Sequence, residues 1–135
     1  MIDIDHFKLV NDTYGHWIGD TVLLKLTRCC QEELRVIDIF GRVGGEEFLA
    51  VLPDTDETQA CEVAERLREH VAKKAVADVA DKKVHITISI GIAVFTPSAR
   101  HDGIAANVLS GYYQGCDHAM YQAKSAGRNQ CVVSK

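Results

Sequence analysis

Apolar and polar residues alternate over positions 84–94 of the chain, beginning at Val84 and continuing through Ile90. A period of two is typical of a β-strand with one buried face, so this stretch predicts a strand. Shorter apolar runs predict further strands at residues 1–4, 35–43, 46–52 and 130–133. The Gly44-Gly45 pair between two of these runs favours a hairpin.

Apolar residues spaced three or four apart predict three helices, over residues 20–34, 55–74 and 104–126. Asp20 is expected to cap the first helix, and Gly127 to end the third. Residues 5–19 predict a loop with a short helical turn. The predicted order is strand, helix, hairpin, helix, strand, helix, strand, which favours one mixed α/β domain over residues 1–135 rather than a bundle or a sandwich.

Composition narrows the class of protein. Charged residues make up 25% and hydrophobic residues 47% of the chain, a balance that predicts an ordinary globular fold rather than disorder. The formal charge of −4 gives no global positive field, so we expect no nucleic-acid partner and no membrane contact. The five cysteines form no C-x-x-C pair and favour free thiols in a reducing, cytoplasmic compartment.

Two carboxylate clusters carry the most informative chemistry. Gly44-Gly45 is followed directly by Glu46-Glu47, and a second cluster, Asp3-Ile4-Asp5, lies at the start of the chain. Glycines let backbone approach a ligand closely, with the acidic side chains beside it. Alone, the glutamate pair would more often be a solvated hairpin rim. Together with Asp3 it favours carboxylates that meet over a divalent cation.

Several motifs occur in order across nearly the whole chain, and with them the sequence resembles the GGDEF domains, the diguanylate cyclases. The motifs are Asp3-Ile4-Asp5-His6-Phe7-Lys8, Asn11-Asp12, Gly15-His16, Gly19-Asp20, Gly44-Gly45-Glu46-Glu47-Phe48, Thr87-Ile88-Ser89-Ile90-Gly91, Tyr121-Gln122-Ala123-Lys124 and Gly127-Arg128-Asn129.

The resemblance implies a palm-like α/β (α+β) fold of the nucleotidyl-cyclase type, with a central, mostly antiparallel sheet flanked by helices. It implies an enzyme that joins two GTP molecules into cyclic di-GMP and releases pyrophosphate, acts as a homodimer and needs Mg²⁺ or Mn²⁺. Family domains begin with a further helix and a complete first strand, so we expect the chain to be truncated at its N-terminus. An upstream sensor or regulatory domain, in a cytoplasmic or membrane-anchored protein, is a further expectation.

The resemblance also implies roles for individual residues. Asp3, the Ile4 carbonyl and Glu46 would hold the metal, in keeping with the preference of Mg²⁺ for oxygen ligands. Glu47 would assist either the metal site or the reacting 3′-hydroxyl. With Asp3, these two glutamates are the expected catalytic residues.

The expected GTP-binding residues come from four segments of the chain. Asn11 and Asp20 would contact guanine, because an amide and a carboxylate match its hydrogen-bonding edge, and Leu23 would line the same pocket. The remaining candidates would approach the triphosphate: Phe7, Lys8, Gly44, Gly45, Lys124 and Arg128. Lys124 and Arg128 could instead simply complement the negative end of a helix.

Arg35 and Asp38 form an Arg-x-x-Asp pair, which in the family is the inhibitory site for cyclic di-GMP, and we expect Arg66 to contribute to it. Taken alone, such a pair is more often a surface ion pair. Two other functions stay open: a non-catalytic cyclic di-GMP receptor that uses Arg35 and Asp38, and a structural dimerisation module. Intact phosphate-binding and metal-binding candidates favour the enzyme over both.

Overall fold

The structure, a computed structural model, describes residues 1–79, 82–95 and 105–135. A five-stranded sheet in the order β2-β3-β1-β6-β7 forms its centre. Only the pairing of β6 with β7 is parallel, and the other pairings are antiparallel. The prediction of a mostly antiparallel central sheet is therefore confirmed. The strands are β1 (Ile2–Ile4), β2 (Ile39–Arg42), β3 (Glu47–Val51), β6 (Ile88–Ile92) and β7 (Cys131–Val133).

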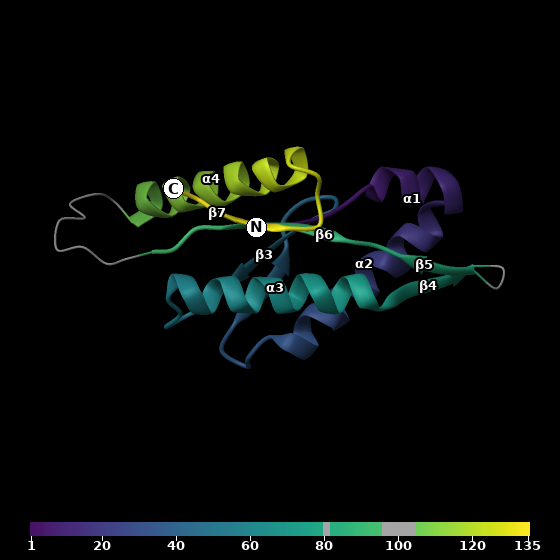
Figure 1. Cartoon of the computed structure of the whole chain (residues 1–135), viewed down its shortest axis with the longest axis horizontal. Coiled ribbons are helices and arrows are strands. Elements are labelled where there is room, and N and C mark those ends of the chain that lie inside the picture. The colour runs from purple at the N-terminus through teal and green to yellow at the C-terminus, as the bar shows by residue number, and fades with distance from the viewer. Residues whose placement is uncertain (80–81, 96–104) are drawn as a thin grey trace.

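Helices cover both faces of this sheet. Figure 1 shows α4 on one side of the sheet and α2 and α3 on the other. The helices are α1 (Phe7–Tyr14), α2 (His16–Glu33), α3 (Glu57–Lys73) and α4 (Ala105–Ser125). Asp56 caps α3 in a reciprocal capping box with Gln59, which satisfies two otherwise unpaired N–H groups.

The alternation along β1 sends its side chains to opposite faces. Ile2 and Ile4 enter the large core with α2 and α3, whereas Met1 packs against Cys116 and Met120 of α4. Asp3 and Asp5 must share the face of Met1, because side chains two apart on a strand point the same way. The sheet thus presents its two N-terminal carboxylates to the last turns of α4.

The close packing of α4 on β6 depends on Gly91. A Cβ atom at this position would collide with the Cys116 carbonyl oxygen and the Met120 backbone nitrogen. The absence of a side chain therefore lets the two backbones come together.

Two predicted boundaries are wrong near the first helices. Residues 7–14 form the eight-residue helix α1 rather than a loop with a short helical turn. The helix α2 begins at His16, so Asp20 lies inside it and does not cap it. Gly15, with φ of +85°, separates the two helices and accommodates a conformation that is unfavourable for other residues. The glycine supplies the break that was expected at Asp20.

The strand predicted over residues 84–94 is divided. Lys82–His85 forms β5, which pairs with β4 (Ala75–Val79) in a separate two-stranded sheet, and β6 begins at Ile88. A period of two cannot reveal where a chain changes its pairing partner, so the pattern hid this break and β4 was missed. β2 is also shorter than predicted, because residues 35–38 form a turn in which the Asp38 N–H donates to the Arg35 carbonyl.

The other helix and strand predictions agree with the structure to within a few residues, as far as they fall on described positions. Position 104, predicted to begin the last helix, lies outside the described residues. All five cysteines are free thiols. In the described parts of the chain, no helix is both long and apolar enough to span a bilayer.

Candidate active site

Asp3 lies at the centre of the sheet, opposite Glu47 of β3 on one side and Ser89 of β6 on the other. Its side chain is only 3% exposed, and its Oδ2 is 2.9 Å from Lys124 Nζ in the last turn of α4. The other oxygen, Oδ1, is buried without a hydrogen-bond partner among the described residues. A buried carboxylate oxygen left unpaired is costly, so this atom points to a function.

The electrostatics of Asp3 have three sources. Burial raises the pKa of its carboxyl above the usual range, and the Lys124 ammonium opposes this by stabilising the charged form. The negative charges of Glu46 and Glu47 raise the Asp3 pKa further. The structure therefore brings all three predicted catalytic carboxylates within electrostatic reach of one another.

Arg42 holds the glycine turn that carries the glutamates. Its guanidinium donates to the carbonyl oxygens of Gly44 and Gly45, with the shortest bond at 2.7 Å to Gly45. The turn is also attached to β1, because the Ile4 N–H donates to the Glu46 carbonyl at 3.3 Å. This second bond places the backbone of Glu46 directly beside the end of β1.

The carboxylate of Glu47 lies over Gly44, in the space that a Cβ atom at position 44 would fill. Gly45 has open space at the corresponding position. The two glycines therefore differ in role: Gly44 makes room for a site carboxylate, and Gly45 leaves the turn open to solvent.

The oxygen ligands at this site fit a hard divalent cation. Asp3 Oδ1 lacks a partner, and Mg²⁺ is commonly held by one or two carboxylates together with substrate phosphates. Within the described ranges, no group of three or more His, Cys, Asp and Glu side chains is arranged to hold a metal by itself. The donor set of Asp3, Glu46 and the Ile4 carbonyl would need oxygen atoms of the ligand to complete the coordination.

The predicted guanine residues lie where α1 meets α2. The Asn11 side-chain oxygen rests against Gly19, and Phe7 packs below the same glycine. Asp20 is exposed, one position further along α2. Leu23 is buried in the large core. Asn11 and Asp20 thus flank Gly19, whereas Leu23 mainly packs the helix onto the sheet.

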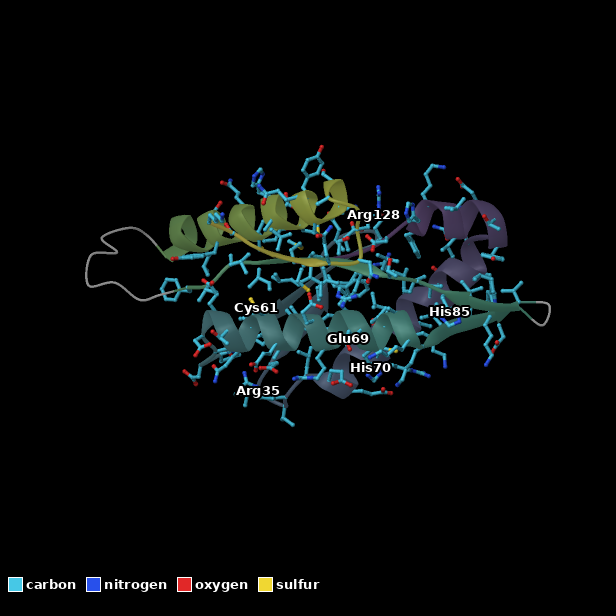
Figure 2. All side chains as sticks on the ribbon, in the orientation of Figure 1. Arg35, Cys61, Glu69, His70, His85 and Arg128 are labelled. Atoms are coloured by element: carbon cyan, nitrogen blue, oxygen red, sulfur yellow. The ribbon has the colours of Figure 1, made fainter. Side chains whose placement is uncertain are left out.

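The predicted phosphate contacts differ in their present partners. Lys8 is 84% exposed and pairs with Asp12 at 2.6 Å, so its ammonium stands on the surface of α1. Lys124 pairs with Asp3 rather than standing free. Arg128 is exposed on the turn between α4 and β7, and Figure 2 shows it on the side of the sheet that carries α4.

Arg35 and Asp38 form a tight pair on the other side of the molecule, as Figure 2 shows for Arg35. The Arg35 guanidinium donates to Asp38 Oδ1 at 2.8 Å and also to the Pro53 carbonyl and the Thr55 hydroxyl. Hydrogen bonding from Arg35 holds the Asp38 pKa below its usual range, and the Asp38 side chain is 1% exposed.

Arg66 approaches the same region from α3. Its guanidinium donates to the side chain and the backbone carbonyl of Glu33, at 2.9 Å and 3.0 Å. Its charge contributes, as the smallest of several effects, to the lowered Asp38 pKa. The three predicted inhibitory-site residues therefore lie in one region, each already held by other protein groups.

The sequence indicated no role for Arg42, and it indicated Asp5 only as a member of the Asp3-Ile4-Asp5 cluster, with no role of its own. Arg42 precedes the glycine turn by two residues, a spacing that could have indicated a side chain folded back onto the turn. The Asp-x-Asp spacing could have shown that Asp5 shares a face with Asp3.

Comparison with known proteins gives a consistent result. The model of the family "Diguanylate cyclase, GGDEF domain" matches residues 1–130. Diguanylate cyclase A of Treponema denticola is 40% identical over 135 residues, which are 100% of this chain and 34% of that protein. The chain thus spans about a third of the length of the curated relatives it matches.

Solved structures agree with the sequence relationship. The active GGEEF domain of a diguanylate cyclase from Vibrio cholerae has a TM-score of 0.85 and 36% identity, covering 99% of this chain and 80% of that one. The GGDEF domain of DgcB from Caulobacter crescentus, in complex with c-di-GMP, has a TM-score of 0.85 and 28% identity, covering 98% of this chain and 74% of that one. The chain belongs to the GGDEF-domain family of diguanylate cyclases.

Proposed function

We propose that this chain is the catalytic domain of a diguanylate cyclase that joins two GTP molecules into cyclic di-GMP. The observation that carries the proposal is the unpartnered, buried Asp3 Oδ1 beside Glu46 and Glu47. A structural carboxylate in this position would be expected to have hydrogen-bond donors on both oxygens, as buried polar groups generally do.

Asp3, Glu46 and the Ile4 carbonyl would hold Mg²⁺ or Mn²⁺. When bound, the cation supplies positive charge that neutralises the phosphoryl oxygens and orients the triphosphate. The hydrogen bond from the Ile4 N–H to the Glu46 carbonyl supports this assignment, because it keeps the end of β1 next to the turn that carries Glu46.

Cations of the protein bind the rest of the triphosphate. Lys124 stands beside Asp3, so it can contact phosphate oxygens without leaving the metal site. Arg128 approaches from the following turn, and the backbone N–H groups near Phe7 and Lys8 contribute at the start of α1. Gly45 lets the ligand lie close to the backbone of the hairpin, and Gly44 contributes by making room for the Glu47 carboxylate beside it.

Asn11 and Asp20 select guanine, with Leu23 supporting the floor of that pocket. An amide offers a donor and an acceptor, and a carboxylate accepts from the N1–H and 2-amino groups of guanine but finds no such donors on adenine. The Asn11 side chain lies against Gly19, the residue that precedes Asp20 in α2, and this proximity supports a shared ligand.

In the reaction, the 3′-oxygen of one GTP forms a bond to the α-phosphorus of another, and the bond to pyrophosphate breaks. Glu47 accepts the proton of the attacking hydroxyl. The step occurs twice, so two GTP yield one cyclic di-GMP and two pyrophosphates. Because each domain binds one GTP, two copies must face each other as a homodimer.

Arg35, Asp38 and Arg66 bind cyclic di-GMP and restrain the enzyme. The side chain of Arg35 is half exposed, and Asp38, Pro53 and Thr55 hold its guanidinium in position, which supports this role. A guanidinium held in this way loses little freedom on binding phosphate or a guanine edge. The relatives are about three times as long as this chain, which supports further sensor or regulatory segments in the whole protein. The expected location of the domain is the cytoplasm.

The same preformed Arg35–Asp38 pair favours one second candidate, a cyclic di-GMP receptor without catalysis. Incubation with GTP and Mg²⁺, followed by mass spectrometry, separates the two. The enzyme forms cyclic di-GMP, Glu46→Ala abolishes formation, and the surface control Asp78→Asn does not. Binding of cyclic di-GMP without any turnover by the wild type would instead establish the receptor.

A further inference from the structure

Asp5 is buried, and its hydrogen bonds join three distant parts of the chain. Its Oδ1 accepts from the Ser89 hydroxyl at 2.7 Å. Its Oδ2 accepts from the Thr87 hydroxyl at 2.7 Å and from the Asn129 backbone N–H at 3.0 Å. Both oxygens are therefore occupied by protein donors, in contrast to Asp3, whose Oδ1 has none.

The turn that Asp5 holds has an unusual backbone. Gly127, Arg128 and Asn129 have φ values of +116°, +64° and +46°. For residues other than glycine, the left-handed region costs about 1–2 kcal/mol per residue. Surrounding contacts must offset this cost, and the Arg128 N–H supplies one by donating to the Ala123 carbonyl at 3.0 Å.

Asp3 in β1 and Asp5 just after it both contact the C-terminal end of α4 and the turn that follows it. Asp3 pairs with Lys124 in the last helical turn, and Asp5 accepts from Asn129 just beyond the helix. Arg128 stands immediately before Asn129 and projects from the same turn. The strand that carries the metal-binding candidate thus also fixes the backbone that carries a phosphate-binding candidate.

We propose that Asp5 is a positioning residue that fixes the left-handed turn and so directs Arg128 toward the triphosphate. This inference rests on the proposed function, since it assigns the triphosphate as the ligand of Arg128. Asp5 itself touches neither the substrate nor the metal, because its oxygens are buried and already accept hydrogen bonds from β6 and from the turn.

A double-mutant cycle tests the coupling between the two residues. The probe is 3′-deoxyguanosine triphosphate with Mg²⁺, which lacks the attacking hydroxyl, and its affinity is measured by calorimetry. Asp5→Ala and Arg128→Ala are each expected to weaken binding about tenfold, the scale of one lost charge-assisted contact. In the Arg128→Ala background, Asp5→Ala should add less than about a twofold loss. Asp5→Asn, which keeps an acceptor for the Asn129 N–H, should bind nearly as well as the wild type.

Equal losses from Asp5→Ala in both backgrounds would overturn the inference, since Asp5 would then act independently of Arg128. Hydrogen exchange at the Asn129 amide provides a readout that does not depend on nucleotide. Exchange should accelerate in Asp5→Ala and not in Asp5→Asn, and unchanged exchange in Asp5→Ala would also overturn the inference.

If Asp5→Ala does not fold, Asp5→Ser serves in the same cycle, because its hydroxyl keeps a polar atom near Ser89 and Thr87 but is too short to reach Asn129. Failure of the wild type to bind the probe at all would overturn both the proposed function and this inference. Wild-type binding with additive losses would overturn the inference alone.

Discussion

Lys124 Nζ lies 2.9 Å from Asp3 Oδ2, so the last turn of α4 supplies the cation nearest to the buried carboxylate of β1. The pairing joins two residues 121 positions apart in the sequence, which the sheet and the packing of Gly91 bring together. It leaves Oδ1 of the same carboxylate for another partner. The proposed metal ligand and the proposed phosphate contact can therefore act as one unit.

The ionised carboxylate of Asp3 is expected to lower the free energy of unfolding at neutral pH. Its folded-state pKa is raised above the ordinary 3.8, mainly by burial. The stabilising contribution of such a group is complete below the unfolded pKa and is lost as the pH rises through the folded pKa. Asp3→Asn should therefore be at least as stable as the wild type at pH 7 without metal, and the difference should shrink toward pH 4. Thermal unfolding over this range measures both effects.

Asp38→Asn is the matched control, because its effect on stability at pH 7 is expected to have the opposite sign to that of Asp3→Asn. Hydrogen bonding from Arg35 lowers the Asp38 pKa, so its contribution is present above the ordinary 3.8 and is lost as the pH falls through the folded value. This variant should be less stable than the wild type at pH 7. A marked loss of stability in Asp3→Asn at pH 7, comparable to that of Asp38→Asn, would contradict the electrostatic account of Asp3.

Arg35→Ala should relieve inhibition by cyclic di-GMP. The substitution removes a charged guanidinium worth about 1.5–3 kcal/mol in hydrogen bonds to a phosphate ligand, so the concentration for half-inhibition should rise at least about tenfold. Initial cyclase rates in the presence of added product measure this. Lys83→Ala, an exposed change on β5, is the control. Unchanged sensitivity in Arg35→Ala would exclude this region as the inhibitory site.

Gly19→Ala should impair the choice of guanine. A Cβ atom at position 19 would meet the Asn11 side-chain oxygen, so the amide has to move away from its present position. The preference for binding GTP over ATP should fall about tenfold, because a polar group built to bond guanine is displaced. Competition binding with the two nucleotides measures it. Retention of the full preference would show that Asn11 does not read the base.

The packing of α4 can be tested with a pair of glycines. Gly91→Ala would place a methyl group against the backbone of Cys116 and Met120, and should destabilise the fold by at least about 2 kcal/mol. Gly111→Ala faces open space within α4 and should stabilise it by about 0.5–1 kcal/mol, because alanine is the better helix former. Denaturant unfolding compares them. Similar effects of the two changes would contradict the packing described for Gly91.

Short-range signals in the sequence predicted most of the strands, and the family resemblance predicted that Asp3, Glu46 and Glu47 come together. The Gly-Gly pair predicts a hairpin, the period of two predicts strands, and the motif resemblance joins Asp3 to Glu46 and Glu47. What the sequence could not supply was the strand register that sets Asp3 opposite Glu47 and Ser89. Register depends on pairing between strands far apart in the chain.

The contacts of Asp5 and Lys124 could not be predicted for the same reason. The partners of Asp5 lie 82 to 124 residues away, so no local pattern indicates a hydrogen-bond network. Lys124 was expected at a phosphate, and its position beside Asp3 depends on the contact between α4 and β1. The prediction of the boundary between α1 and α2 failed for a different, local reason: Gly15 was interpreted as part of a loop rather than as the break between two helices.

Asp3 and Glu46 are proposed to hold one cation together with GTP. Electron paramagnetic resonance of Mn²⁺, which substitutes for Mg²⁺, measures this without requiring turnover. The account predicts about one GTP-dependent Mn²⁺ ion per chain, with affinity reduced at least about 100-fold in Asp3→Asn and in Glu46→Gln, and unchanged in Asp78→Asn. Undiminished Mn²⁺ binding in both site variants would contradict the account.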